Sequence, residues 1–288
     1  MKRAARWAIG AGVVLLAIAA VGVASRFGVE PSSRCPDGAV PIGARCCFEG
    51  QSLESGMCTG TPTRCPEHLR RHAGDVQCFT DQTIRTRVEG GDLETRMVDW
   101  EAAGRTDPPH GRVETFMIDK FEVTEARWAG CEKAELCPHT ALGEERWLPV
   151  RNISSAAAEG FCKFVGGHLP TPEQHALAGA GLEGRRYPWG NTGAVCRRAA
   201  FGLEHGPCAE AATGPDAIGM RPDGATPTGV HDLSGNVAEW AVDSRGKVWI
   251  RGGSYKSTSA AALRTWSMTP SNGDPAADVG FRCAYSFE

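Results

Sequence analysis

The twelve cysteines of this chain constrain its fold most, because all of them follow an uncharged N-terminal run. That run, Trp7 to Ala24, comes directly after the basic residues Lys2, Arg3 and Arg6. A basic flank before an apolar segment is typical of an export signal, and the segment is also long enough to span a bilayer. Residues 1–26 are therefore predicted to be either a cleaved signal peptide or a single transmembrane anchor.

Export determines the expected chemistry of the cysteines and the location of the protein. An even number of cysteines in an oxidising compartment is expected to pair completely. The protein is predicted to lie at the cell envelope, either membrane-anchored through the N-terminal helix or released as a periplasmic or extracellular protein. The net charge of −3 and the absence of a long basic run argue against a nucleic-acid partner.

Half of the cysteines crowd into a short segment that has few large apolar residues. This composition predicts a small disulfide-rich module, followed by a linker, over residues 27–90. His68 and His72 also lie in this segment with the i, i+4 spacing that would place them on one face of a helix, so a zinc site is an alternative. Export favours disulfides over zinc binding. Six cysteines allow 15 pairings, and the pairing is left open: Cys35, Cys46, Cys47, Cys58, Cys65 and Cys78.

The pattern changes after a polar stretch, residues 82–114, which is either a linker or the first irregular strands of the next domain. We place that domain at residues 91–288. An alternating segment, residues 113–124, predicts a strand. Three short helices are expected next. Thr124 is the expected N-cap of the first, and Ser154 or Ser155 that of the second, which ends at the glycine pair 166–167. The third is expected to have Pro172 in its first turn. Glycine and proline predict long irregular coil over residues 185–229.

Several blocks of this domain occur in an order that resembles the formylglycine-generating enzyme (sulfatase-modifying factor) family. The resemblance covers roughly residues 113–288. It implies an α+β, irregular, coil-rich, C-type-lectin-like fold, which neither composition nor periodicity could show. The blocks that carry it are "FMIDKFEVTEARW", "LPVRNISSAAAEGFCKFVGGHLPTPEQH", "GLEGRRYPWGN", "GVHDLSGNVAEW", "IRGGSY" and "DVGFRC".

The block "HDLSGNVAEW" implies a structural calcium site, because the family binds calcium at this loop. Oxygen ligands from one tight loop are what a hard cation requires. Carried over to this chain, the ligands are the side chains of Asp232 and Glu239 and the backbone carbonyls of Gly235 and Val237. The alternative is a turn in which the aspartate caps a neighbour and the glutamate is solvated. The family's second calcium loop falls at Ala200–Phe201, where alanine replaces an expected asparagine.

Three disulfides are expected in the domain. The resemblance implies that Cys162, on a helix, pairs with Cys283, near the C-terminus. Each of the remaining pairs brackets a short loop, so local pairing is expected between Cys131 and Cys137 and between Cys196 and Cys208.

In the loop after "RGGS", this chain lacks the residues that carry out the family's oxidase chemistry. In the family, two cysteines five residues apart bind Cu(I), which prefers soft sulfur ligands. The corresponding positions here are Ser257 and Ala262, whose hydroxyl and methyl groups cannot replace thiolates. The helix after "LPT" also departs from the family, because Pro172, His175 and Ala176 stand where it is rich in Glu and Trp. Copper is therefore not expected as a cofactor.

These observations predict a non-catalytic protein that binds a peptide, a protein or a glycan through a groove inherited from the family. The candidate groove residues are Arg251, Trp266 and Asn272. One alternative is a divergent metal-dependent oxidase with other ligands, and another is a purely structural component of the envelope. A hydrolytic site built on Ser257 and a histidine is a further hypothesis, although no base lies beside Ser257 in the sequence.

Overall fold

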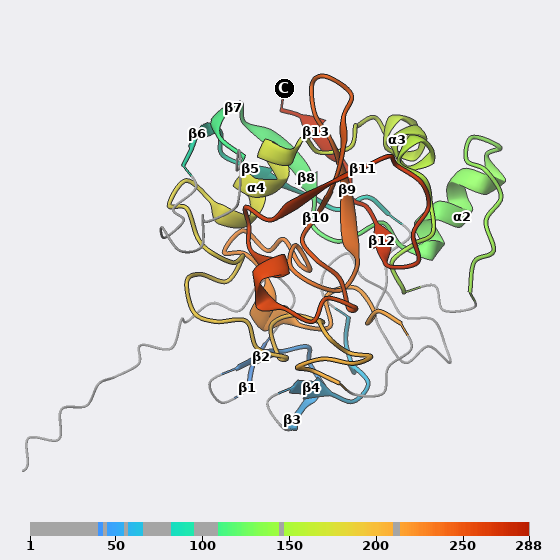
Figure 1. The fold of residues 1–288 in the computed structure, drawn as a ribbon. Coiled ribbons are helices and arrows are strands. Elements are labelled where there is room, and N and C mark those ends of the chain that lie inside the picture. The colour runs from blue at the N-terminus through green and yellow to red at the C-terminus, as the bar shows by residue number, and fades with distance from the viewer. Residues whose placement is uncertain are drawn as a thin grey trace, which may run out of the picture. The chain divides into compact units, whose positions relative to one another are not determined.

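The computed structural model describes residues 40–42, 45–54, 57–65, 82–94, 109–143, 147–209 and 214–287 (Figure 1). The predicted N-terminal helix lies outside these residues, as do the possible zinc ligands His68 and His72 and the cysteines Cys35 and Cys78. Within the described ranges, the helices are all too short or too polar to cross a membrane.

A four-stranded sheet lies next to the candidate site, with strand order β11-β10-β9-β12. Strand β10 pairs antiparallel with both of its neighbours, and β12 runs parallel to β9. The β-branched and aromatic residues of β9 and β10 suit a pleated surface that is packed on its neighbours. The strands are β9 (Ala238–Val242), β10 (Val248–Arg251), β11 (Met268–Ser271) and β12 (Val279–Gly280).

A second sheet joins the start of the domain to its end. Strand β8 (Phe116–Asp119) lies between β13 (Ala284–Ser286) and β5 (Arg85–Val88) and pairs antiparallel with both. Phe116 and Ile118, two residues apart in β8, are both buried, as expected for one face of a strand. Because β5 pairs with β8, the polar residues before the predicted boundary at residue 91 include a strand of this domain.

The predicted strand over residues 113–124 is in fact two strands. Strand β7 (Gly111–Val113) ends before β8 begins and pairs instead with β6 (Gly91–Leu93). Gly90 packs against the break, since a Cβ there would lie 2.4 Å from the Thr115 backbone nitrogen. The alternation of apolar residues continued across this corner, so periodicity alone did not reveal it.

The three predicted helices are present, and each begins with a hydroxyl residue whose side chain accepts a backbone N–H. Ser154 rather than Ser155 caps the second helix, and Gly166 follows it with φ of 81°. Thr171 and Gln174 form a reciprocal capping box on the third. The helices and their caps are α2 (Glu125–Lys133, Thr124), α3 (Ser155–Phe164, Ser154) and α4 (Pro172–Ala180, Thr171).

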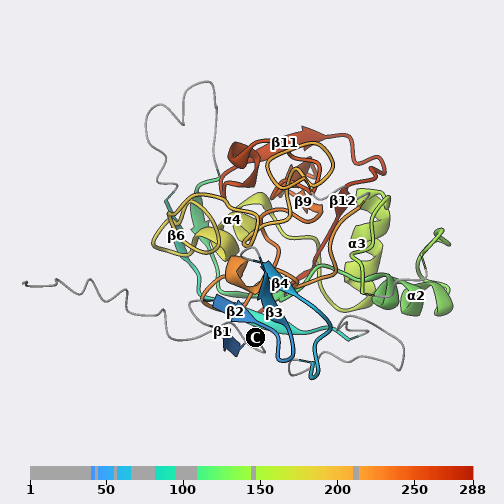
Figure 2. The ribbon, with the colours of Figure 1, turned by 90° about the horizontal axis from the view of Figure 1, so that it is seen from below.

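Helix α3 packs through aromatic side chains against the segment before β13 and against α2. Phe161 of α3 stacks on Trp128 of α2 at 5.7 Å between ring centroids, and Phe281 packs edge-on against both rings. Figures 1 and 2 show α3 and α4 on opposite sides of β9. The core therefore fixes β9 from both sides, and β9 carries Glu239, one of the candidate site residues.

The described part of the N-terminal module contains two short hairpins joined by a disulfide. Strands β1 (Val40–Ile42) and β2 (Arg45–Cys47) pair antiparallel, as do β3 (Ser52–Glu54) and β4 (Met57–Thr59). Cys47 is bonded to Cys58. Cys65 is also in a disulfide.

The described residues between α4 and β9, which include the predicted coil over residues 185–229, are coil apart from one 3-10 turn, η1 (Pro222–Gly224). The Cys196–Cys208 disulfide closes a loop within it. The remaining disulfides of the domain are Cys131–Cys137 and Cys162–Cys283, so all three pairings named from the sequence are present in the structure.

Candidate functional site

The loop after β10 is shaped by two glycines with left-handed backbone conformations. Gly252 has φ of 79° and Gly253 has φ of 69°, values that disfavour side chains. A Cβ on Gly252 would lie 2.8 Å from the Leu233 carbonyl oxygen, and one on Gly253 would lie 2.9 Å from the Leu263 side chain. These glycines let residues 254–262, which we call the reaction loop, pack closely on the segment before β9.

Ser257 uses its hydroxyl group to close a turn in the reaction loop. Its Oγ accepts a hydrogen bond of 2.9 Å from the Ser254 backbone N–H, and its own N–H donates to the Ser254 carbonyl at 2.9 Å. The Ser254 hydroxyl in turn donates to Asp278 at 2.6 Å. Ser257 is therefore a turn residue, held by local hydrogen bonds rather than by a catalytic base.

Ala262 lies in a short 3-10 helix, η2 (Ala260–Leu263), and its N–H donates to the Ser259 carbonyl. Its methyl group provides no metal ligand. All described cysteines of the domain are in disulfides, so none of them offers a thiolate to this loop. The residues of the reaction loop therefore do not fit Cu(I).

Two of the three candidate groove residues are inside the protein. Arg251 is 1% exposed and donates from Nη2 to the Thr265 carbonyl at 2.6 Å, and Trp266 is 2% exposed. Asn272 is exposed and donates to Asp274 at 2.6 Å in a turn at the end of β11. Arg251 and Trp266 thus serve packing in this structure, and the three residues do not line one open groove.

The loop named as a calcium site is tightly folded against residue 200. Gly235 has φ of 94°, and a Cβ there would lie 2.6 Å from the Ala200 carbonyl oxygen. That carbonyl accepts from the Asn236 N–H at 2.8 Å. Asp232 accepts from the Gly219 N–H at 2.6 Å. Burial raises the pKa of Asp232 to about 6, and the nearby carboxylates of Asp216 and Glu239 add to this effect.

Glu239 is engaged by a buried arginine. Its two carboxylate oxygens accept from Arg282 Nε at 2.9 and 2.8 Å, and Oε1 also accepts from Arg282 Nη2 at 2.7 Å. His175 Nε2 lies 3.3 Å from Oε2. Burial alone would raise the pKa of Glu239, but Arg282 and His175 lower it to about 2. Burial lowers the pKa of His175, so its imidazole is neutral at pH 7.

A third carboxylate, which is fully buried, supports the same loop. Glu122 accepts from the Asn236 side-chain amide at 2.7 Å and from the Val237 N–H at 3.1 Å. Burial raises the pKa of Glu122, and the charges of Asp232 and Glu239 raise it further. The three carboxylates thus lie in one electrostatic cluster around Arg282, which we call the arginine cluster: Glu122, His175, Asp232, Glu239 and Arg282.

Calcium does not fit the donor set that the resemblance implies. Calcium takes six to eight oxygen ligands. Both carboxylate oxygens of Glu239 accept hydrogen bonds from Arg282. Asp232 Oδ2 accepts a hydrogen bond from the Gly219 N–H. At Ala200, the second family loop offers a methyl group, and its carbonyl is hydrogen-bonded.

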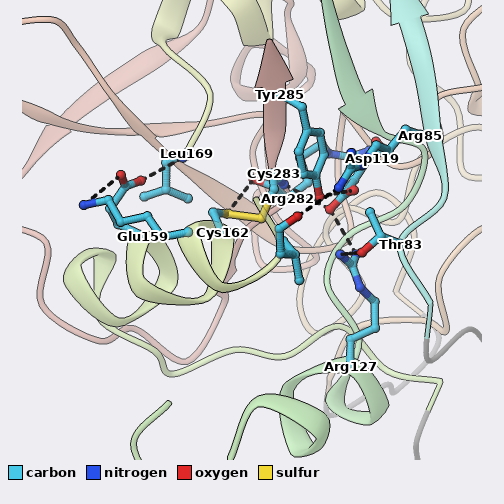
Figure 3. Close-up of a disulfide and its surroundings, with 12 residues drawn as sticks. Thr83, Arg85, Asp119, Arg127, Glu159, Cys162, Leu169, Arg282, Cys283 and Tyr285 are labelled. Atoms are coloured by element: carbon cyan, nitrogen blue, oxygen red, sulfur yellow. Dashed lines mark hydrogen bonds and ion pairs between the residues drawn. A yellow bond between two sulfur atoms is a disulfide. The ribbon is translucent and has the colours of Figure 1, made fainter. Parts of the chain in front are cut away.

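Asp119 links this cluster to the Cys162–Cys283 disulfide, as Figure 3 shows. It accepts from Arg127 Nη1 at 3.0 Å, from the Tyr285 hydroxyl at 2.9 Å and from the Cys283 N–H at 3.2 Å. Neither Asp119 nor Arg282 was predicted from the sequence to be a structural centre. A charged residue between apolar ones in "GFRC" was the available signal, since buried arginines require partners.

Comparisons with known proteins identify the domain. A family described as "Sulfatase-modifying factor enzyme 1-like domain" matches residues 77–287. The mouse protein "Inactive C-alpha-formylglycine-generating enzyme 2" is 33% identical over 168 residues, covering 52% of this chain and 53% of that protein. The mouse "Formylglycine-generating enzyme" is 29% identical over 162 residues, covering 47% and 44%.

A solved structure shows the same fold at low sequence identity. The structure of PvdO from Pseudomonas aeruginosa matches with a TM-score of 0.58 at 17% identity, over 72% of this chain and 95% of that one. The chain spans about half the length of the curated relatives it matches. The family match covers most of the chain and includes the reaction loop and the arginine cluster. The chain therefore belongs to the formylglycine-generating enzyme family of sulfatase-modifying factor domains.

Proposed function

We propose that this protein is a non-catalytic member of its family, exported to the cell envelope, where it binds a peptide, a protein or a glycan. One observation carries the proposal. The two positions at which the family's oxidases hold Cu(I) are a turn-closing serine, Ser257, and an alanine, Ala262. Neither can bind or activate copper.

The relatives support this assignment. The mouse relative with 33% identity is named as an inactive formylglycine-generating enzyme, whereas the one named as an active enzyme is 29% identical. The disulfides support an oxidising environment, which is typical of exported proteins. Attachment to the membrane through residues 1–26 is part of the proposal.

Copper binding and peptide oxidation test the loss of catalysis. Residues 27–288 are loaded with Cu(I) in competition with a chromophoric chelator and then incubated with a peptide containing Cys-x-Pro-x-Arg. We expect no stoichiometric copper and no loss of peptide mass. The mouse formylglycine-generating enzyme, treated identically, is the positive control.

A matched double variant, Ser257→Cys with Ala262→Cys, tests whether only the ligands are missing. We expect it to bind copper more tightly than the unmodified protein, because it restores two thiolates at the family spacing. Copper binding and peptide turnover by the unmodified protein would contradict the proposal and support a divergent oxidase.

A further inference from the structure

We infer that the guanidinium group of Arg282 is the internal cation that holds the loop from Asp232 to Glu239, and that this loop is organised without calcium. The inference goes beyond the proposed function, because it concerns a different part of the domain and does not depend on the copper chemistry. It also departs from what the family resemblance implies for these residues.

All three nitrogens of the Arg282 guanidinium are used. Nε donates to both oxygens of Glu239, and Nη2 donates to Glu239 at 2.7 Å and to the His231 carbonyl at 2.7 Å. Nη1 donates to the carbonyls of Asp119 and Lys120, both at 3.2 Å. One side chain thus ties the end of β8, the residue before Asp232 and β9 together through a carboxylate and three carbonyls. A bound calcium ion would serve oxygens of the same kinds.

The backbone around Arg282 keeps its side chain in place. The Asp119 N–H donates to the Cys283 carbonyl at 2.9 Å, and the Cys283 N–H donates to the Asp119 carboxylate. Cys283 is also bonded to Cys162 on α3. Because the residue after Arg282 is fixed on both sides, the guanidinium is preorganised at Glu239 and loses little entropy there.

The contact between Arg282 and Glu239 is closed to solvent. The side chains are 0% and 1% exposed. His175 of α4 lies against the second carboxylate oxygen, and a Cβ on Gly252 would lie 3.9 Å from the His175 ring. A residue with a large side chain at position 252 would therefore meet the neighbouring backbone and approach this ring.

A calcium ion at Glu239 would have to displace Arg282 or share the carboxylate with it. Sharing places a divalent cation beside a buried guanidinium, where repulsion is strong because the local dielectric constant is low. Displacement would leave Arg282 buried without its carboxylate, a change that is strongly destabilising. Arg282 and calcium are therefore alternative ways to neutralise Glu239, and this chain uses Arg282.

Calcium dependence of the melting temperature tests the inference directly. Residues 27–288 are purified, treated with EGTA, and melted with and without calcium, while equilibrium dialysis measures bound calcium. We expect no bound calcium and the same Tm in both buffers. If calcium did bind, a calcium concentration of about 100 times the Kd would instead raise Tm by roughly 5–10 °C. Stoichiometric calcium with such a rise, abolished in Asp232→Ala, would overturn the inference.

A set of arginine variants measures the role of the internal cation. Arg282→Met removes the charge at similar length, Arg282→Lys keeps the charge but loses the fork of donors, and Arg112→Met changes an arginine whose side chain is 68% exposed. We expect a large loss of Tm for Arg282→Met, a smaller one for Arg282→Lys and almost none for Arg112→Met. If Arg282→Met were as stable as Arg112→Met, the inference would fail. If Arg282→Met does not fold, the calcium measurement on the unmodified protein still decides.

Discussion

The arginine cluster and the reaction loop lie in the same domain, but they differ in how their side chains are held. In the arginine cluster, Glu239 and Arg282 form a buried ion pair, and Arg282 also donates to the carbonyls of Asp119, Lys120 and His231. In the reaction loop, the glycines that set the backbone are present, but the side chains at the two reactive positions are a hydroxyl and a methyl. The groups that hold the fold are complete, whereas the groups that would perform the reaction are missing.

The difference has a physical origin. Removing one partner of the buried Glu239–Arg282 ion pair leaves an uncompensated charge and costs several kcal/mol, so these two residues can change only together. The side chains of the reaction loop carry no such penalty, because Ser257 and Ala262 are held by local backbone hydrogen bonds. Function resides in sites placed on a fold, and such sites can change while the fold stays the same.

The largest expected effect concerns the disulfide beside the arginine cluster. Cys162 and Cys283 are 121 residues apart, and replacing both with alanine should lower the free energy of unfolding by about 4–5 kcal/mol. The matched control replaces Cys131 and Cys137, which are six residues apart, and should cost about 2 kcal/mol because the closed loop is shorter. Urea denaturation measures both. Equal losses would show that chain closure does not explain the stabilisation.

Glu239→Gln tests the cluster itself. The change leaves Arg282 buried beside a neutral amide, so we expect a loss of about 4 kcal/mol in the free energy of unfolding. Glu89→Gln is the control, because Glu89 forms an exposed ion pair with Arg87 at 3.0 Å and should cost less than about 1 kcal/mol. Comparable losses for the two variants in urea denaturation would remove the distinction between cluster and surface.

Asp232→Asn should stabilise the protein at neutral pH. The folded state holds a proton on Asp232 more tightly than the unfolded chain does, because its pKa is about 6 rather than 3.8. Its contribution to stability is therefore complete below pH 3.8 and is lost as the pH rises through 6, a difference of about 3 kcal/mol. Asparagine removes this loss and can still accept from the Gly219 N–H.

The measurement compares the free energies of unfolding of the two proteins between pH 4 and pH 8. The difference between Asp232→Asn and the unmodified protein should grow from acid to neutral pH. Glu239 does not disturb the comparison, because its low pKa makes it lose its stabilising effect only as the pH falls from 4.5 towards 2. A difference that does not vary with pH would show that Asp232 has an ordinary pKa.

Features encoded by neighbouring residues could be predicted from the sequence. The helix caps Thr124 and Ser154 lie directly before their helices, and Cys131–Cys137 and Cys196–Cys208 close short loops. Local hydrogen bonds and short loops carry a signal within a few residues of sequence. The Cys162–Cys283 pair, which joins distant segments, came only from the family resemblance.

Features that depend on distant segments could not be predicted. Glu239 and Arg282 are 43 residues apart, and nothing in either block shows that their side chains meet. Arg251 was predicted to line a groove inherited from the family, but it ends a strand that lies between β9 and β11, and its side chain is buried. Burial depends on which strands flank a segment, and that order is a property of the whole fold.

The smallest expected effect is that of Ser257→Ala in the reaction loop. The variant loses the acceptor for the Ser254 N–H, a partly buried hydrogen bond, so we expect a cost of about 1 kcal/mol or less. This hydroxyl closes a turn and does not act as a nucleophile. We therefore expect neither the unmodified protein nor the variant to react with a fluorophosphonate probe. Labelling of the unmodified protein that Ser257→Ala abolishes would identify a reactive serine. The reaction loop would then have exchanged one chemistry for another, and its contrast with the arginine cluster would have to be reinterpreted.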